Sequence, residues 1–210
     1  MTSGSTLTLD GVVVPAAGSV LDVVLAAGVE LPHLCKDDNL PAIGACRTCL
    51  VEADGRIVAA CSVAASSVRE VVSGSERAVR LRRGVLELTA AMVTPGDTSG
   101  GPLGVTFRDT LARAGVADSP PDAPQPRSHL DASNSFFTFR EDDCILCGRC
   151  VSACQALQHI SAIGMAGRGR ATRVTPGADE TFRQSVCTSC GSCVAACPTT
   201  ALSPRMEVRS

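Results

Sequence analysis

The sequence predicts an α+β protein, and three observations carry this prediction. Two hairpin signals flank a short helical segment near the N-terminus, an amphipathic stretch follows in the middle, and one pattern of cysteines occurs twice near the C-terminus. The chain has 210 residues, which is enough for two or three small domains. We divide it into residues 1–73, 74–118, 119–134 and 135–210.

The N-terminal part is expected to be rich in β-structure. Asp-Gly pairs at 10–11 and 54–55 each separate two apolar runs, and this pair suits the type I′ turn of a tight hairpin. Between the hairpins, Ser19 can cap a short helix that Gly28 would end. Strand, strand, helix, strand, strand is the order of a β-grasp fold, which we expect for residues 1–73.

The middle of the chain is expected to be a small helical segment followed by a linker. Residues 75–93 form an amphipathic pattern, with Val79, Val85, Leu86 and Leu88 on or near its apolar face. A second helix is expected at 107–114. Four prolines fall between residues 119 and 126, which indicates a linker before the last domain.

Composition excludes several classes of protein. There are 19 basic and 21 acidic residues, so the net charge of −2 offers no electrostatic footprint for nucleic acid. The N-terminus lacks a basic leader region, and no apolar run reaches the roughly 18 residues of a membrane span. We therefore expect a cytoplasmic protein, in which the twelve cysteines are metal ligands rather than disulfide partners.

A cysteine pattern that occurs twice is the strongest chemical signal. Its two copies are Cys144, Cys147, Cys150 and Cys154, and Cys187, Cys190, Cys193 and Cys197. In the bacterial ferredoxin run with this spacing, the fourth cysteine binds the cluster of the other run. The expected ligand sets of two 4Fe–4S clusters are therefore Cys144, Cys147, Cys150 and Cys197, and Cys187, Cys190, Cys193 and Cys154.

Two glycines in the cysteine runs support an iron–sulfur interpretation, and the cysteine spacing argues against zinc sites. Gly148 and Gly191 lie where such a loop needs unusual backbone dihedrals or a close approach to the cluster. A Cys-x-x-Cys pair is also a zinc signature, but zinc ribbons separate two pairs by a long gap. Four cysteines within eleven residues, found twice, favour iron–sulfur clusters.

Four further cysteines occur in the N-terminal part, namely Cys35, Cys46, Cys49 and Cys61. The plant-type 2Fe–2S pattern has a first gap of four residues, whereas the gap here is ten. Spacing alone leaves a 2Fe–2S cluster, a zinc ion and a structural site open. The β-grasp context favours 2Fe–2S, because that fold places a cysteine loop beside the strand that bears the last ligand.

Around these cysteines the chain resembles a known family. The matching segments are Ile43-Gly44-Ala45-Cys46-Arg47-Thr48-Cys49, Asp143-Cys144-Ile145-Leu146-Cys147-Gly148-Arg149-Cys150-Val151 and Cys187-Thr188-Ser189-Cys190-Gly191-Ser192-Cys193-Val194. They resemble the N-terminal part of the large iron–sulfur subunit of respiratory complex I. The same module occurs in the diaphorase iron–sulfur subunit of NAD-reducing hydrogenase and in NAD-dependent formate dehydrogenase.

This resemblance implies one 2Fe–2S cluster and two 4Fe–4S clusters in an electron-transfer subunit. The implied partners are a flavoprotein subunit that binds FMN and NAD(H), and a catalytic subunit. A molybdopterin formate dehydrogenase with molybdenum or tungsten is the first expectation. A bidirectional NiFe hydrogenase or a complex I-like NADH dehydrogenase is the alternative. A zinc-binding scaffold or regulatory module is the alternative of another class.

The sequence also departs from this family. Its members usually have a middle segment in which one histidine and three cysteines bind a further 4Fe–4S cluster. Residues 83–88 match the start of that segment, but 92–97 stand where the histidine and the first cysteine would fall. No cysteine lies between Cys61 and Cys144. We expect this cluster to be absent.

No catalytic constellation is found. The chain lacks a glycine-rich nucleotide loop between a strand and a helix, and every cysteine is assigned to a cluster. His33 is expected to make a loop hydrogen bond rather than to bind metal. Arg47 and Arg149 lie between ligand cysteines, where they either raise a cluster's reduction potential, occupy ordinary surface positions or contact a partner subunit. Arg82 is expected on a solvated helix face.

Overall fold

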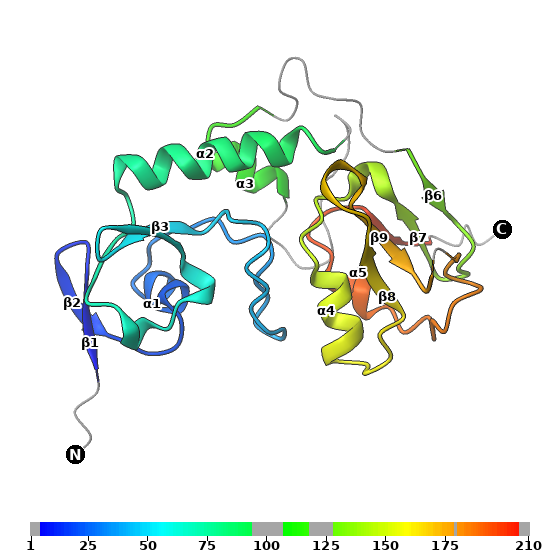
Figure 1. Cartoon of the computed structure of the whole chain (residues 1–210), viewed down its shortest axis with the longest axis horizontal. Coiled ribbons are helices and arrows are strands. Elements are labelled where there is room, and N and C mark those ends of the chain that lie inside the picture. The colour runs from blue at the N-terminus through cyan, green and yellow to red at the C-terminus, as the bar shows by residue number, and fades with distance from the viewer. Residues whose placement is uncertain (1–4, 94–106, 118–127, 179, 206–210) are drawn as a thin grey trace. The chain divides into compact units, whose positions relative to one another are not determined.

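The computed structural model in Figure 1 describes residues 5–93, 107–117, 128–178 and 180–205. The chain divides into two compact units. The first contains Met1–Lys36 and Ala42–Leu86, and the second contains Asp37–Pro41 and Glu87–Ser210. Among the described residues, no helix has the length and apolar character to cross a membrane.

The first unit is built on a five-stranded sheet. Its strands are β1 (Thr6–Leu9), β2 (Val12–Pro15), β3 (Leu50–Ala53), β4 (Arg56–Ala59) and β5 (Glu70–Val72). Their order in space is β2-β1-β5-β3-β4, in which β1 and β5 are parallel and the other pairs are antiparallel. Helix α1 (Val20–Ala26) contributes buried residues to the same core as the strands. This is the expected β-grasp arrangement.

The expected turn and cap chemistry is confirmed. Asp10 and Gly11 have φ of +48° and +85°, and the second Asp-Gly pair has the same pattern, as type I′ turns require. The hydroxyl of Ser19 accepts the N–H of Asp22 at 3.2 Å, and the Asp22 carboxylate accepts the Ser19 N–H at 2.8 Å. Each side chain thus caps an N–H group of the first turn of α1, and the two form a capping box.

Strand β5 was not predicted from the sequence, although it lies at the centre of the sheet. Both hairpin turns bind its ends. The Asp10 carboxylate accepts the N–H of Ser73 at 2.8 Å and its hydroxyl at 2.6 Å. The Asp54 carboxylate accepts the N–H of Glu70 at 3.0 Å. The two turn aspartates therefore fix a strand of only three residues.

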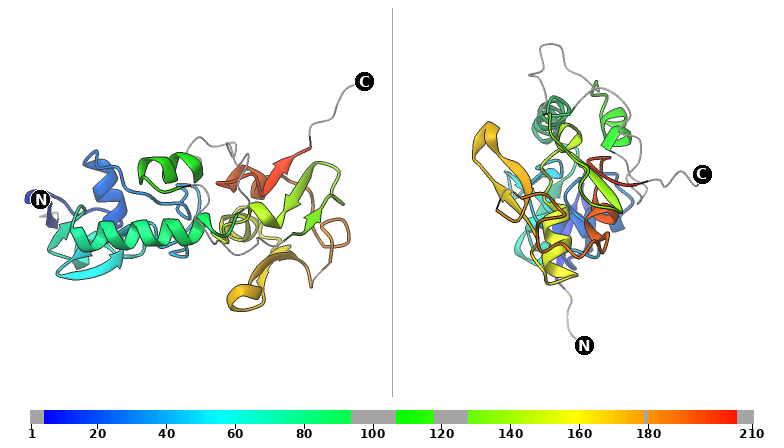
Figure 2. Two further views of the ribbon diagram at one scale, coloured as in Figure 1. Left: turned by 90° about the horizontal axis from the view of Figure 1, so that it is seen from above. Right: turned by 90° about the vertical axis from the view of Figure 1, so that its right-hand side faces the viewer.

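Two helices follow, close to the expected ranges. Helix α2 (Glu76–Ala90) is the long ribbon in Figure 2, and α3 (Phe107–Arg113) comes after it. Leu86 of the predicted apolar face is buried, but Val79 and Leu88 are 46% and 73% exposed, so the prediction for α2 was partly wrong. Its buried positions are Ala78, Leu86, Thr89 and Ala90. Residues 119–127 of the predicted linker lie outside the described residues.

Arg82 also faces inward from α2, contrary to the expectation of a solvated face. Its guanidinium donates to the carbonyl oxygens of Leu50 and Ser73, each at 2.7 Å. Burial lowers the pKa of Arg82, although the group stays charged near neutral pH. The side chain therefore ties the helix to the ends of β3 and β5.

The second unit has two small sheets and two short helices. Strands β6 (Leu130–Asp131), β7 (Phe137–Arg140) and β10 (Leu202–Pro204) form one sheet, and β8 (Ile163–Ala166) and β9 (Arg173–Pro176) form the other. Figure 2 shows the β8–β9 hairpin extending away from the other strands of this unit. Helices α4 (Arg149–Ala156) and α5 (Ser192–Ala196) pack against each other.

Cysteines make up much of the core of this unit. The ring of Phe182 packs edge-on against Phe137 and Phe139, with ring centroids 5.0 and 6.1 Å apart. The same buried cluster includes Cys144, Cys150, Cys154, Cys193 and Cys197. The unit therefore builds part of its core from the side chains that are expected to bind metal.

Candidate metal centres

The four N-terminal cysteines come together beside the β3–β4 hairpin. Cys49 immediately precedes β3, and Cys61 lies in the single turn that follows β4. The side chains of Cys49 and Cys61 interact with each other, and Cys61 also interacts with Cys35. The N–H of Cys46 points to the sulfur of Cys35 at 3.5 Å. The structure thus gathers residues that span 27 positions of sequence into one set.

A buried threonine that was not predicted from the sequence supports this set. The Thr48 hydroxyl accepts the N–H of Leu34 at 3.2 Å and lies 3.1 Å from the Cys46 sulfur. Because a thiolate ligand has no proton, the hydroxyl must be the donor to sulfur once Cys46 binds metal. The Thr48 side chain is fully buried, so water does not compete for this bond.

The second set consists of Cys144, Cys147, Cys150 and Cys197, each only 8% exposed. Cys150 lies in the first turn of α4, and Cys197 follows α5 directly. Electrostatic interactions join Cys150 to the other three members of the set. The fourth cysteine of the later run therefore lies with the first three of the earlier run, as the ferredoxin pattern predicts.

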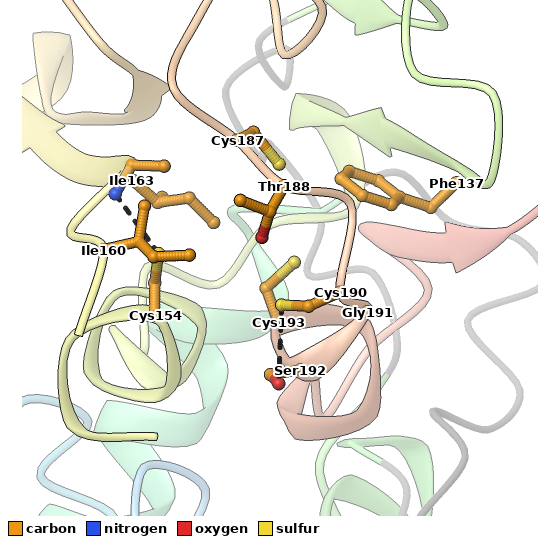
Figure 3. Close-up of a pocket in the computed structure, with 11 residues that line it drawn as sticks. Phe137, Cys154, Ile160, Ile163, Cys187, Thr188, Cys190, Gly191, Ser192 and Cys193 are labelled. Atoms are coloured by element: carbon orange, nitrogen blue, oxygen red, sulfur yellow. Dashed lines mark hydrogen bonds between the residues drawn. The ribbon is translucent and has the colours of Figure 1, made fainter. Parts of the chain in front are cut away.

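The third set contains Cys187, Cys190, Cys193 and Cys154, and it lines a pocket of about 310 Å³ that is partly open to solvent. Figure 3 shows the sulfur atoms of Cys187, Cys190 and Cys193 directed towards one space beside Thr188. Cys154 reaches the pocket from α4, and its sulfur accepts the N–H of Ala162 at 3.2 Å. Cys190 is exposed whereas Cys193 is buried, so this set has one open side.

The sequence duplication is repeated in the backbone of the two loops. Leu146 and Ser189 have φ of +54° and +58°, and the glycines that open α4 and α5 both have φ of +78°. The N–H of Leu146 points to the Cys144 sulfur at 3.5 Å, and that of Ser189 to the Cys187 sulfur at 3.4 Å. Each loop turns its N–H groups towards sulfur in the same way.

The electrostatics of the thiols fit a positively charged metal group. Burial, and after it the neighbouring Cys187, Cys190 and Cys154, together raise the pKa of Cys193 to about 12. The pKa of Cys150 is also raised. Burial is the largest cause, and its three partner cysteines act in the same direction. Such thiols stay protonated at neutral pH unless a cation replaces their protons. The cavity, the thiol sets and the inward N–H groups all fit iron–sulfur clusters.

Hydroxyl groups recur two residues after cysteines in all three sets. The Thr199 hydroxyl accepts the N–H of Ala201 at 3.2 Å and lies 3.5 Å from the Cys197 sulfur. The Ser192 hydroxyl lies 3.6 Å from the Cys190 sulfur. A Cys-x-Thr or Cys-x-Ser pattern was the available sequence signal for these residues.

The remaining sequence candidates fall into different environments. Nδ1 of His33 lies 2.6 Å from the carbonyl oxygen of Leu31, so the expected loop hydrogen bond is confirmed. Arg47 is exposed, whereas Arg149 is largely buried. Of the two arginines between ligand cysteines, only Arg149 is shielded from solvent.

Comparison with known proteins matches two iron–sulfur families to separate parts of the chain. Residues 5–75 match the 2Fe-2S iron-sulfur cluster binding domain family, and residues 143–201 match the 4Fe-4S dicluster domain family. The putative formate dehydrogenase YrhE of Bacillus subtilis is 30% identical over 150 residues, which are 68% of this chain. The NADP-reducing hydrogenase subunit HndD of Solidesulfovibrio fructosivorans is 33% identical over 183 residues, or 81% of this chain.

The two curated relatives are much longer than this chain, which covers 15% of YrhE and 31% of HndD. One solved structure contains a chain that this protein matches over most of both lengths. A chain in the crystal structure of NAD+-reducing [NiFe]-hydrogenase in the H2-reduced state is 33% identical, with a TM-score of 0.83. The match covers 97% of this chain and 88% of that chain. The protein therefore belongs to the family of iron–sulfur proteins, shared by formate dehydrogenase-like proteins and NAD(P)-reducing hydrogenases, that combine an N-terminal 2Fe–2S domain with a 4Fe–4S dicluster domain.

Proposed function

We propose that this chain relays electrons between two other redox centres and performs no substrate chemistry of its own. The observation that carries the proposal is the gathering of all twelve cysteines into three sets of four, two of them in a duplicated ferredoxin loop. When bound, iron–sulfur clusters accept and release single electrons. The chain's part is to hold, orient and shield them.

Each set has a proposed cluster. Cys35, Cys46, Cys49 and Cys61 would hold one 2Fe–2S cluster. Cys144, Cys147, Cys150 and Cys197 would hold one 4Fe–4S cluster, and Cys187, Cys190, Cys193 and Cys154 the other. Backbone N–H groups and the Thr48 and Thr199 hydroxyls would donate to the ligand sulfurs, which stabilises the more negative, reduced state.

The proposed partners are a flavoprotein subunit with FMN and NAD(H) and a molybdopterin formate dehydrogenase subunit. The match to YrhE, a putative formate dehydrogenase, supports the second partner. A NiFe hydrogenase is the second candidate, favoured by the match to 88% of a chain of NAD+-reducing [NiFe]-hydrogenase. A cytoplasmic location belongs to the same proposal, because cysteines that bind metal rather than form disulfides suit a reducing compartment.

The relay is tested by removing one cluster from the native complex. A Cys190→Ser variant should lose the third centre and stop electron transfer from formate or hydrogen to NAD+. It should leave NADH oxidation by an artificial dye on the flavin side unchanged. Val186→Ala, at an exposed residue of the same loop, serves as the control. Equal loss of the dye reaction in the Cys190 variant would contradict the relay.

The same complex identifies the catalytic partner. Reduction of the clusters by formate alone supports the formate dehydrogenase, and reduction by hydrogen alone supports the hydrogenase. Reduction by NADH but by neither donor would contradict both partner assignments.

A further inference from the structure

Arg149 distinguishes one of the two duplicated cysteine loops from the other. It stands between Cys147 and Cys150, at the position that Ser192 occupies between Cys190 and Cys193. The Arg149 side chain is only 12% exposed. One loop therefore carries a buried cation next to its metal site, and the equivalent loop carries a small neutral residue.

The partner of this cation is Asp37, which also belongs to the second unit. A terminal nitrogen of Arg149 donates to the Asp37 carboxylate, whose side chain is only 9% exposed. The same carboxylate accepts the N–H of Asn39 at 2.9 Å. Leu40, from the same short segment, packs against Ala153 and Ala196. The segment that supplies the counterion is thus anchored on α4 and α5.

One donor of Arg149 is left over. Its Nε is buried and has no hydrogen-bond partner among the described residues. Burial raises the pKa of the neighbouring Cys147, whereas the backbone N–H and the charge of Arg149 both act to lower it. A cluster bound by Cys147 would place sulfur acceptors and negative charge beside the Arg149 guanidinium. Its Nε–H could then donate to a cluster sulfur.

The sign of the electrostatic effect follows from the charges. Adding an electron makes a cluster more negative, so a nearby cation stabilises the reduced state and raises the reduction potential. A nearby anion does the opposite. Because both side chains are shielded from water, solvent screens these interactions less than it would at the surface.

We propose that Arg149 is a tuning residue that raises the reduction potential of the 4Fe–4S cluster on Cys144, Cys147, Cys150 and Cys197, and that Asp37 is the counterion that limits this rise. The proposal rests on the cluster assignment made above. It predicts that neutralising either residue shifts the potential of this cluster, and that the two shifts have opposite signs.

The test is an EPR-monitored redox titration of the cluster-loaded protein with dithionite and mediator dyes. Arg149→Gln should lower the reduced-to-oxidised ratio of this cluster at the wild-type midpoint about tenfold, a downward shift of ~59 mV for one electron. Asp37→Asn should raise the ratio. Arg149→Lys keeps the charge and should stay near the wild type. Arg168→Gln, at an exposed residue in the turn between β8 and β9, makes the same change of net charge as a control.

The results separate this inference from the proposed function. Wild-type protein without two 4Fe–4S signals would overturn the function itself. If both signals are present and neither Arg149→Gln nor Asp37→Asn moves the potential, the function stands and the tuning role is wrong. Shifts of the same sign, or an equal shift in the Arg168 control, would also overturn it. If Arg149→Gln fails to hold the cluster, the upward shift of Asp37→Asn still decides.

Discussion

Gly148 and Gly191 occupy equivalent positions in the two duplicated loops, and both have a φ of +78°. Each opens a helix that carries a cysteine in its first turn. Each glycine lies two residues before this cysteine in a left-handed conformation, which costs little for glycine. The sequence repeat is thus also a repeat of backbone geometry.

Replacing Gly191 with alanine should destabilise the protein by ~1 kcal/mol. A Cβ there meets no atom within 4 Å, so the effect comes from the backbone conformation alone. Anaerobic thermal unfolding of the cluster-loaded protein should show an apparent midpoint lower by roughly 2–4 °C.

Gly84→Ala is the matched control, because Gly84 lies inside α2 with equally open surroundings. Alanine favours the helix, so the midpoint should rise. A shift of the same sign in both variants would contradict the conformational explanation.

Asp10→Gly should weaken the first unit by about 1–3 kcal/mol, because it removes both hydrogen bonds from Ser73. Glycine tolerates the positive φ of this turn, so the loss reports on the bonds to the end of β5. Urea unfolding followed by far-UV circular dichroism measures the effect. Asp10→Asn keeps an acceptor, so its stability should lie between that of the wild type and that of Asp10→Gly. Unchanged stability of Asp10→Gly would show that the aspartate does not hold β5.

Thr48→Val should lower the reduction potential of the proposed 2Fe–2S cluster, because it removes the hydroxyl beside the Cys46 sulfur. The N–H of Leu34 would also lose its buried acceptor, so some stability should be lost. Thr48→Ser keeps the hydroxyl and should retain the potential. EPR titration of the 2Fe–2S signal is the readout, and equal potentials in the valine and serine variants would refute the role.

The crossed ligand sets make a prediction about pairs of cysteines. Cys154→Ala and Cys190→Ala should abolish the same 4Fe–4S EPR signal, although Cys154 belongs to the earlier run. Cys197→Ala should instead abolish the other signal. Loss of the Cys187-set signal in the Cys197 variant would mean that each run binds its own cluster.

Local chemistry explains what could be predicted from the sequence. The Asp-Gly turns, the cap at Ser19 and the glycines of the cysteine loops depend on residues close to them in the chain, and each has the expected geometry. Strand β5 could not be predicted in this way. It has three residues with only Val71 buried, and its place depends on pairing with β1, some 60 residues earlier.

The face of α2 and the environment of Arg149 show the same limit. Periodicity indicated a helix, but the buried side includes Arg82, which is charged and is accommodated by two carbonyl oxygens of other elements. The burial of Arg149 depends on Asp37, 112 positions away in the sequence. Both arginines bind partners far away in the sequence, so the residues near Arg82 or Arg149 in the chain show no pattern that would predict these contacts.

The proposed content of one 2Fe–2S and two 4Fe–4S clusters per chain can be checked by metal analysis. Iron, zinc and acid-labile sulfide should be measured on anaerobically purified protein, with EPR of the reduced sample. We expect about ten iron and ten sulfide per chain and three cluster signals. About three zinc ions per chain without sulfide, as four-cysteine zinc sites would give, would contradict it.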